Sequence, residues 1–151
     1  MILPGKEGKI KVVLSTNGYG GINLKKTIKI HTNDVKKPVI QLLMTGDVKK
    51  FVFLEPEIIS LKGKVGESIT AQMKITPNIA EDFNLLKTFA KDGKDIAFSL
   101  KKIKTETDDY FILSVQNKKQ TPGRYFDMIT LQSDLSPPRL IKIRVSGNIS
   151  N

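Results

Sequence analysis

The residues that could carry acid–base or metal chemistry are few and poorly spaced. His31 is the only histidine and there is no cysteine, so a metal site would need several carboxylates around one imidazole. Five of the fifteen acids lie in two short runs, at residues 92–95 and 106–109. Lys94 interrupts the first run, and the second lacks the turn glycine and the spaced ligands of a calcium loop. We therefore interpret both runs as solvated turns and His31 as a structural surface residue.

Nucleophilic catalysis and phosphate binding also lack their usual signatures. Serine and threonine are common, but no Gly-x-Ser-x-Gly elbow and no plausible base accompany them. The glycine-rich stretch at residues 17–21, NGYGG, is followed by no helical pattern whose start could cradle an anion. It predicts a tight chain reversal instead. We expect a protein without catalytic activity, cofactor or metal.

Positive charge is the strongest compositional feature. The formal net charge is +10, and lysine supplies 22 of the 25 basic residues. Ten lysines and three acids lie in residues 1–50, and five of these lysines form a candidate basic patch: Lys25, Lys26, Lys29, Lys36 and Lys37. Such a patch attracts polyanions, meaning nucleic acid, acidic polysaccharide or lipid headgroups. Arginine and exposed aromatics are scarce, which makes nucleic acid an unlikely partner. Lysines that guard solvated strand edges are the simpler interpretation.

The elements that must position these residues are organised by an internal repeat. Residues 27–48 return within residues 127–149, and a shift of 101 positions aligns the two copies without a gap. The shift matches aliphatic with aliphatic and glycine with glycine: Ile28 with Ile129, Ile30 with Leu131, Ile40 with Ile141, Leu42 with Ile143, Met44 with Val145 and Gly46 with Gly147. In each copy, apolar and polar residues alternate, a polar loop that contains proline follows, and a second alternating run comes after it. That pattern predicts a β-hairpin.

Repeats about 100 residues apart are typical of tandem immunoglobulin-like sandwiches. The sequence predicts an all-β protein in which residues 49–151 form one complete immunoglobulin-like β-sandwich. Residues 1–48 are expected to form the C-terminal half, about three strands, of another such module. Besides the hairpins, strands are expected at residues 8–16, 58–64, 68–76, 96–104 and 110–116. Residues 49–57 should cross between the modules. Residues 77–90 fit either a helix or a strand, and the favoured interpretation is a strand from about residue 84 preceded by a single helical turn at residues 79–83.

Three strands of a seven-stranded sandwich leave one apolar face and two edges uncovered. The residues expected on this candidate interface are Ile10, Val12, Leu14, Ile28, Ile30, Leu42 and Met44. The cover could come from four further strands of the same module. It could equally come from a protein partner or from a second copy, through strand pairing, swapping or homodimerisation.

The turns and strand ends carry a family resemblance. The residues concerned are Pro4-Gly5, Gly18-Tyr19, Thr32-Asn33-Asp34, Pro38-Val39 and Gly46-Asp47-Val48, and more loosely Pro122-Gly123-Arg124, Ser133-Asp134 and Gly147-Asn148-Ile149. This pattern resembles the hydin-like (ASH) and major-sperm-protein-like immunoglobulin-fold domains, in particular an uncharacterised bacterial envelope protein family. The resemblance implies a non-enzymatic scaffold that binds proteins and is exported to the periplasm or cell envelope. No stretch has the apolar length of a signal peptide or a membrane span, so the compartment stays open.

Two functions follow from these patterns. The favoured one is a non-catalytic immunoglobulin-like module, part of a tandem array, that acts as a structural or protein-binding element. The alternative is a polyanion-binding domain that uses the lysine-rich first half. The two differ in the expected effect of salt, since polyanion binding weakens steeply as salt rises.

Overall fold

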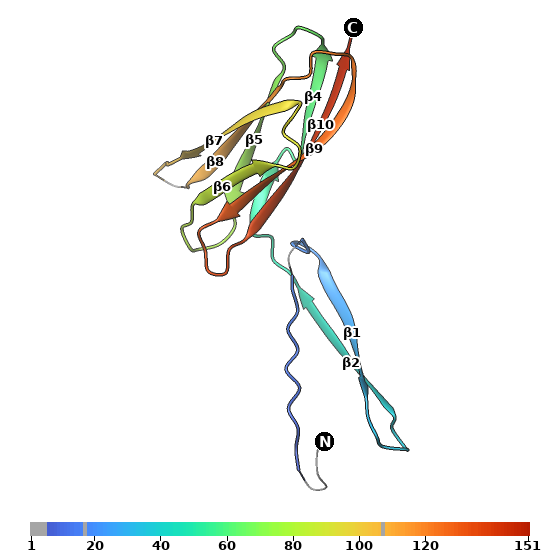
Figure 1. Cartoon of the computed structure of the whole chain (residues 1–151). Coiled ribbons are helices and arrows are strands. Elements are labelled where there is room, and N and C mark those ends of the chain that lie inside the picture. The colour runs from blue at the N-terminus through green and yellow to red at the C-terminus, as the bar shows by residue number, and fades with distance from the viewer. Residues whose placement is uncertain (1–5, 17, 107) are drawn as a thin grey trace. The chain divides into compact units, whose positions relative to one another are not determined.

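The computed structural model describes residues 6–16, 18–106 and 108–151. These residues form ten β-strands and no helix, and the chain divides into two compact units, Met1–Lys49 and Lys50–Asn151 (Figure 1). Within the described ranges, therefore, no helix is long and apolar enough to cross a membrane. The predicted all-β class is confirmed.

The first unit contains one antiparallel hairpin, formed by β1 (Asn23–His31) and β2 (Val39–Asp47). The strand predicted at residues 8–16 is wrong, because these residues are not in a strand. Their alternation shows which side chains could share a face, but a strand also needs a neighbour whose backbone completes the hydrogen-bond ladder. No such neighbour exists for them in the described part of the chain.

Three residues of the predicted turns fall outside the described ranges. They are Pro4, Gly5 and Asn17. The remaining part of the glycine-rich turn is described, and Gly18 and Gly21 both have positive φ, as the predicted chain reversal requires.

The second unit is a sandwich of two four-stranded sheets. In the order β4-β10-β9-β6, the strands of the first sheet are Ile58–Lys64, Leu140–Ser150, Gly123–Ser133 and Leu85–Ala90. In the order β3-β5-β8-β7, those of the second are Val52–Glu55, Thr70–Pro77, Tyr110–Asn117 and Ile96–Ile103. Every neighbouring pair is antiparallel except β4 and β10, which run parallel. This is the immunoglobulin arrangement with its first strand divided between the two sheets, so the predicted sandwich fold is confirmed.

Two local predictions need correction. Residues 49–57 are not only a crossing segment, because β3 lies within them and pairs with β5 in one sheet before β4 joins the other. The helical turn considered at residues 79–83 is absent, since residues 79–81 form bends and residues 82 and 83 have no regular structure. The strand favoured from about residue 84 is present as β6, with an irregular register at its start.

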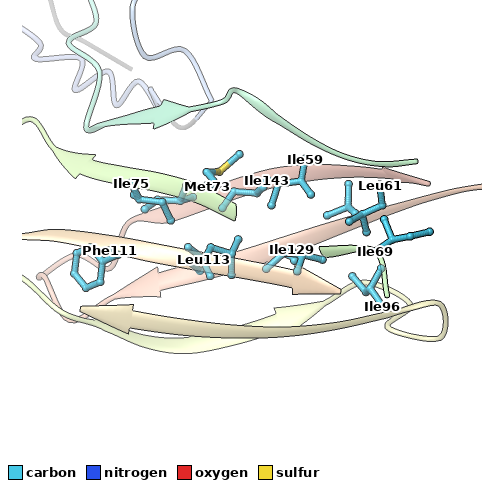
Figure 2. Close-up of a cluster of buried hydrophobic side chains, with 14 of the residues drawn as sticks. Ile59, Leu61, Ile69, Met73, Ile75, Ile96, Phe111, Leu113, Ile129 and Ile143 are labelled. Carbon is cyan, nitrogen blue, oxygen red and sulfur yellow. The ribbon is translucent and has the colours of Figure 1, made fainter. Parts of the chain in front are cut away.

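The core lies between the two sheets and is built from alternate residues of their strands. Figure 2 shows Met73 and Leu113 of one sheet in the same cluster as Ile129 and Ile143 of the other, and all four side chains are fully buried. Burial of one such side chain stabilises the folded state by about 1.5–3 kcal/mol. The ring of Phe83 closes one region of the core against two other rings, with centroid distances of 4.8 Å to Phe51 and 5.7 Å to Phe111.

A tyrosine and a glycine fix the start of β9 against the end of β10. The Tyr125 hydroxyl donates a 2.8 Å hydrogen bond to Asn117 Oδ1 at the end of β8. Gly147 lies directly opposite Tyr125 in the ladder, and a Cβ atom built there would overlap the ring atoms Cε1 and Cζ. Residue 147 must therefore be glycine so that the Tyr125 ring can lie across the β10 backbone.

Candidate functional site

The β1–β2 hairpin of the first unit has the same register as the β9–β10 hairpin of the second. Leu24 is paired with Gly46 in the first ladder, and Tyr125 is paired with Gly147 in the second. Adding 101 to both members of any pair in the first hairpin gives a pair in the second. The repeat found in the sequence therefore extends to strand register.

The turns of the two hairpins also close in the same way. The Thr32 amide donates to the Pro38 carbonyl at 2.9 Å, and the Ser133 amide donates to the Arg139 carbonyl at 2.9 Å. In the first turn the Thr32 hydroxyl also accepts a hydrogen bond from the Asp34 amide. The hydroxyl residue at the end of the first strand thus has a structural role in both copies.

The two hairpins pair their strands in the same way but differ in how far their apolar side chains are buried. Ile143 is fully buried, whereas its counterpart Leu42 is 47% exposed. Ile141 is 5% exposed, and its counterpart Ile40 is 41% exposed. In the second unit a facing sheet covers these positions, but the described part of the first unit contains only the two strands of the hairpin. At Ile40 and Leu42 the first hairpin therefore presents core-type side chains to solvent, which is unfavourable for apolar surface. Ile28, Ile30 and Met44 are half-buried, and Leu24 is buried.

Cross-strand partners share a face, and one face of the hairpin is almost entirely apolar. We call it the hairpin apolar face, and it comprises Leu24, Ile28, Ile30, Ile40, Leu42 and Met44. Four of these were predicted as interface residues. Leu24 and Ile40 were missed, although the 101-residue shift places them on the buried Tyr125 and Ile141. That shift was the signal that could have identified them.

The other three predicted interface residues lie outside the ladder. Ile10, Val12 and Leu14 belong to residues 6–16, where no strand forms. All three side chains are exposed. The structure does not place them in the hairpin sheet, so the predicted interface is divided between a paired and an unpaired segment.

The candidate basic patch is divided between two faces and a turn. Lys25 and Lys29 lie on the face opposite the hairpin apolar face, together with His31. Lys26 lies on the apolar side, with its Nζ 5.5 Å from the centroid of the Tyr19 ring. The remaining two lysines of the patch are in the turn between β1 and β2. The hairpin thus does not gather the five cations on one surface.

The first acidic run is a turn that a third carboxylate holds in place. Asp127 Oδ1 accepts a hydrogen bond from the Asp92 amide at 3.1 Å, and Oδ2 accepts one from the Gly93 amide at 2.8 Å. Burial acts to raise the pKa of Asp127, but the backbone N–H donors, with Met128 among them, outweigh it and lower the pKa. In the described ranges, no group of three His, Cys, Asp or Glu side chains could hold a metal ion.

Lys102 is a cation whose side chain points toward the core side of β7. Its Nζ lies 2.8 Å from Asp82 Oδ1 and 3.4 Å from Asp109 Oδ2, and it also donates to the Phe83 carbonyl. The hydrogen bond to Asp82 raises the pKa of Lys102, and burial opposes that shift. The alternation of residues along β7 could have predicted this orientation, because Lys102 continues the inward series of Ile96, Phe98 and Leu100.

One shallow depression lies on the outer face of the second sheet, with a volume of about 250 Å³. Its lining residues are Thr70, Ala97, Phe98, Ser99, Ser114 and Gln116. None of these side chains titrates near neutral pH, so the lining supplies neither a general acid nor a general base.

Comparisons with known proteins give structural matches only. No protein-family profile matches the sequence, and no curated protein matches it. The solved structures that match include protocadherin gamma B7 extracellular cadherin domains 1–4, with 12% identity, 84% of this chain and 32% of that chain covered, and a TM-score of 0.45. Mouse clustered PcdhgC3 EC1-3 matches with 7% identity, coverage of 85% and 42%, and a TM-score of 0.45. Protocadherin gamma C5 EC1-3 matches with 10% identity, coverage of 85% and 43%, and a TM-score of 0.36. This chain thus spans less than half the length of each of them.

Proposed function

We propose that this chain is a non-catalytic immunoglobulin-like module that acts as a structural or protein-binding element, and that the hairpin apolar face is where it associates. One observation carries the proposal: the same hairpin, in the same register, is buried in the second unit and uncovered in the first. The counterparts of its six apolar side chains belong to the core of the second unit, whereas in the first hairpin Ile40 and Leu42 are exposed and only Leu24 is buried. An association that covers the exposed side chains gains the hydrophobic free energy that the hairpin alone forgoes.

The chemistry of this face also selects its partner. Cover of the kind seen in the second unit consists of β-strands with an apolar inner face, and β1 and β2 each have an edge free of partners among the described residues. Strand pairing at an edge supplies backbone hydrogen bonds, and the apolar face supplies burial. The partner is therefore a β-strand surface, either a neighbouring module of a tandem array or, in the pure protein, a second copy.

Polyanion binding is the alternative function, and charge alone supports it. The lysines of the candidate basic patch lie on two faces and a turn, which reduces the charge that one ligand could meet at once. Affinity for heparin that falls steeply with salt would favour this alternative, since such binding depends on the release of counterions.

The molar mass in solution tests the proposal directly. We expect size-exclusion chromatography with light scattering to give a dimer that persists from 50 mM to 500 mM NaCl, because apolar association does not depend on charge screening. Leu42→Asp should give a monomer. Leu43→Asp is the matched control, because Leu43 is 68% exposed on the opposite face and its substitution should leave the dimer intact.

A monomer in all three proteins would contradict self-association. The fluorescent probe ANS then decides whether the apolar face is free to bind at all, since it reports exposed apolar surface. If ANS binds the wild type but not Leu42→Asp, the hairpin apolar face is exposed, and the proposal then holds for a partner module other than a second copy of this chain. Wild type that is monomeric and does not bind ANS would overturn the proposal.

A further inference from the structure

The outer face of the β4-β10-β9-β6 sheet carries only positive charge. Ile129 and Ile143 are buried inward, so the residues that alternate with them point outward, and strand register extends this assignment to β4 and β6. Six cations occupy outward positions: Lys62, Lys64, Lys87, Arg124, Lys142 and Arg144. All six are exposed, and no acidic residue occupies an outward position on these four strands. We call this surface the cationic face.

Apolar side chains are interleaved with these cations. Phe126 is 79% exposed and Phe89 is 51% exposed. In one row across the sheet, Met128, Arg144 and Ile58 stand side by side. This face therefore combines exposed rings, aliphatic side chains and cations, and protein interfaces are enriched in aromatics, methionine and arginine.

The other sheet of the same unit gives an internal comparison. Its outward positions are mixed: they hold neutral polar residues, apolar residues such as Phe53 and Ile112, and only three charged residues. These three are Lys74, Lys101 and Glu55. Both sheets bury their inner faces in one core, so the two outer faces would be expected to have a similar composition if each met only water. The two outer faces instead differ in charge: the cationic face holds six cations and no acid, whereas the other face holds two cations and one acid.

We propose that the cationic face binds an acidic protein surface that also presents apolar side chains. Charge complementarity selects the acidic partner, since opposite potentials raise the association rate and exclude like-charged surfaces. The aliphatic residues Ile58 and Met128 favour a protein partner, because protein interfaces are enriched in apolar side chains and methionine. Phe126 and Phe89 could also stack on bases, so the test includes an oligonucleotide. The proposal concerns the second unit alone and does not depend on association through the hairpin.

Selection from a phage-displayed library of random peptides tests the proposal with the full chain as target. We expect the enriched peptides to carry several Asp or Glu residues with Leu or Phe between them. The dissociation constant of one enriched, fluorescein-labelled peptide, measured by anisotropy, should rise at least tenfold in Arg144→Glu and at least threefold in Phe126→Ser. Lys101→Glu is the matched control, because Lys101 is exposed on the outer face of the other sheet, and it should change the constant less than twofold.

Three outcomes would overturn the proposal. Failure to enrich acidic peptides would remove the partner class. An effect of Lys101→Glu as large as that of Arg144→Glu would mean general charge attraction rather than a defined face. Tighter binding of a labelled 20-nucleotide oligothymidine than of the peptide, with the same response to Arg144→Glu, would assign the face to single-stranded nucleic acid. Circular dichroism melting of each variant confirms that a loss of binding is not a loss of fold.

Discussion

At the scale of single residues, the packing at position 147 requires glycine, whereas the packing at the equivalent position 46 does not. Gly147 leaves room for the Tyr125 ring, while a Cβ atom at Gly46 would meet nothing within 4 Å. The repeat places Leu24 where the second unit has Tyr125. The first hairpin has therefore kept the glycine without the ring that makes it necessary in the second.

We expect Gly147→Ala to destabilise the second unit by about 3 kcal/mol, because overpacking displaces the Tyr125 ring and strains its hydrogen bond. Thermal unfolding followed by circular dichroism measures the change. Gly46→Ala is the control from the repeat and should shift the midpoint very little. Equal effects of the two substitutions would mean that backbone entropy, not the close approach to Tyr125, decides the outcome.

The hydroxyl of Tyr125 makes the free energy of unfolding depend on pH in the alkaline range. Burial, with the nearby charges of Asp95 and Asp127, raises the pKa of Tyr125 to about 12 from its ordinary value of 10. A pKa that is higher in the folded state contributes stability that is present below pH 10 and lost as the pH rises toward 12. Urea unfolding at pH 9 and pH 11 should therefore show a larger loss for the wild type than for Tyr125→Phe. Tyr110→Phe serves as the control, because it keeps Tyr125 and should lose as much stability between pH 9 and pH 11 as the wild type. If Tyr110→Phe instead lost as little stability as Tyr125→Phe, the pH dependence could not be assigned to Tyr125 alone.

At the scale of elements, the two hairpins share register and turn closure but differ in what covers them. A two-stranded hairpin with nothing against its face is marginal in water, whereas a hairpin in a sandwich opens only with the whole unit. Pairing alone therefore does not set the stability of either hairpin.

Hydrogen–deuterium exchange measures this difference. We expect the amides of β1 and β2 to exchange at least about a hundredfold faster than their counterparts 101 residues later, because the free energy of opening is much smaller without cover. Dilution to a concentration that favours monomer makes the comparison cleanest. Equal protection in the two hairpins would show that something else covers β1 and β2.

The alternation of residues gave most of these elements correctly, and the errors share one cause. β4 was predicted with its observed bounds, and the two hairpins were predicted from the repeat. The strand at residues 8–16 failed and β3 was missed, because strand formation depends on a partner that can lie far away in the sequence. The alternation of residues predicts which face of a strand a side chain occupies, but it does not show whether a second strand is present to pair with it.

At the scale of the whole molecule, charge is sorted in a way that composition could not reveal. The sequence drew attention to the lysines of the first half, but these lie on different faces of the hairpin. The cations that share one surface come from four strands that are distant in sequence, such as Lys62, Lys87 and Arg144. Only the strand order brings them together, so no reading of local clusters would have found the cationic face.

The parallel pairing of β4 with β10 has a mechanical consequence for the second unit. Because the two strands run in the same direction, the start of the unit and its C-terminal end lie at opposite ends of the sandwich (Figure 1). A pulling force applied between Lys50 and Asn151 would drive β4 and β10 past each other along their length. All seven residue pairs from Ile58–Arg144 to Lys64–Ser150 would carry that load together rather than break one after another. The parallel ladder would therefore resist extension of the chain as one cooperative unit.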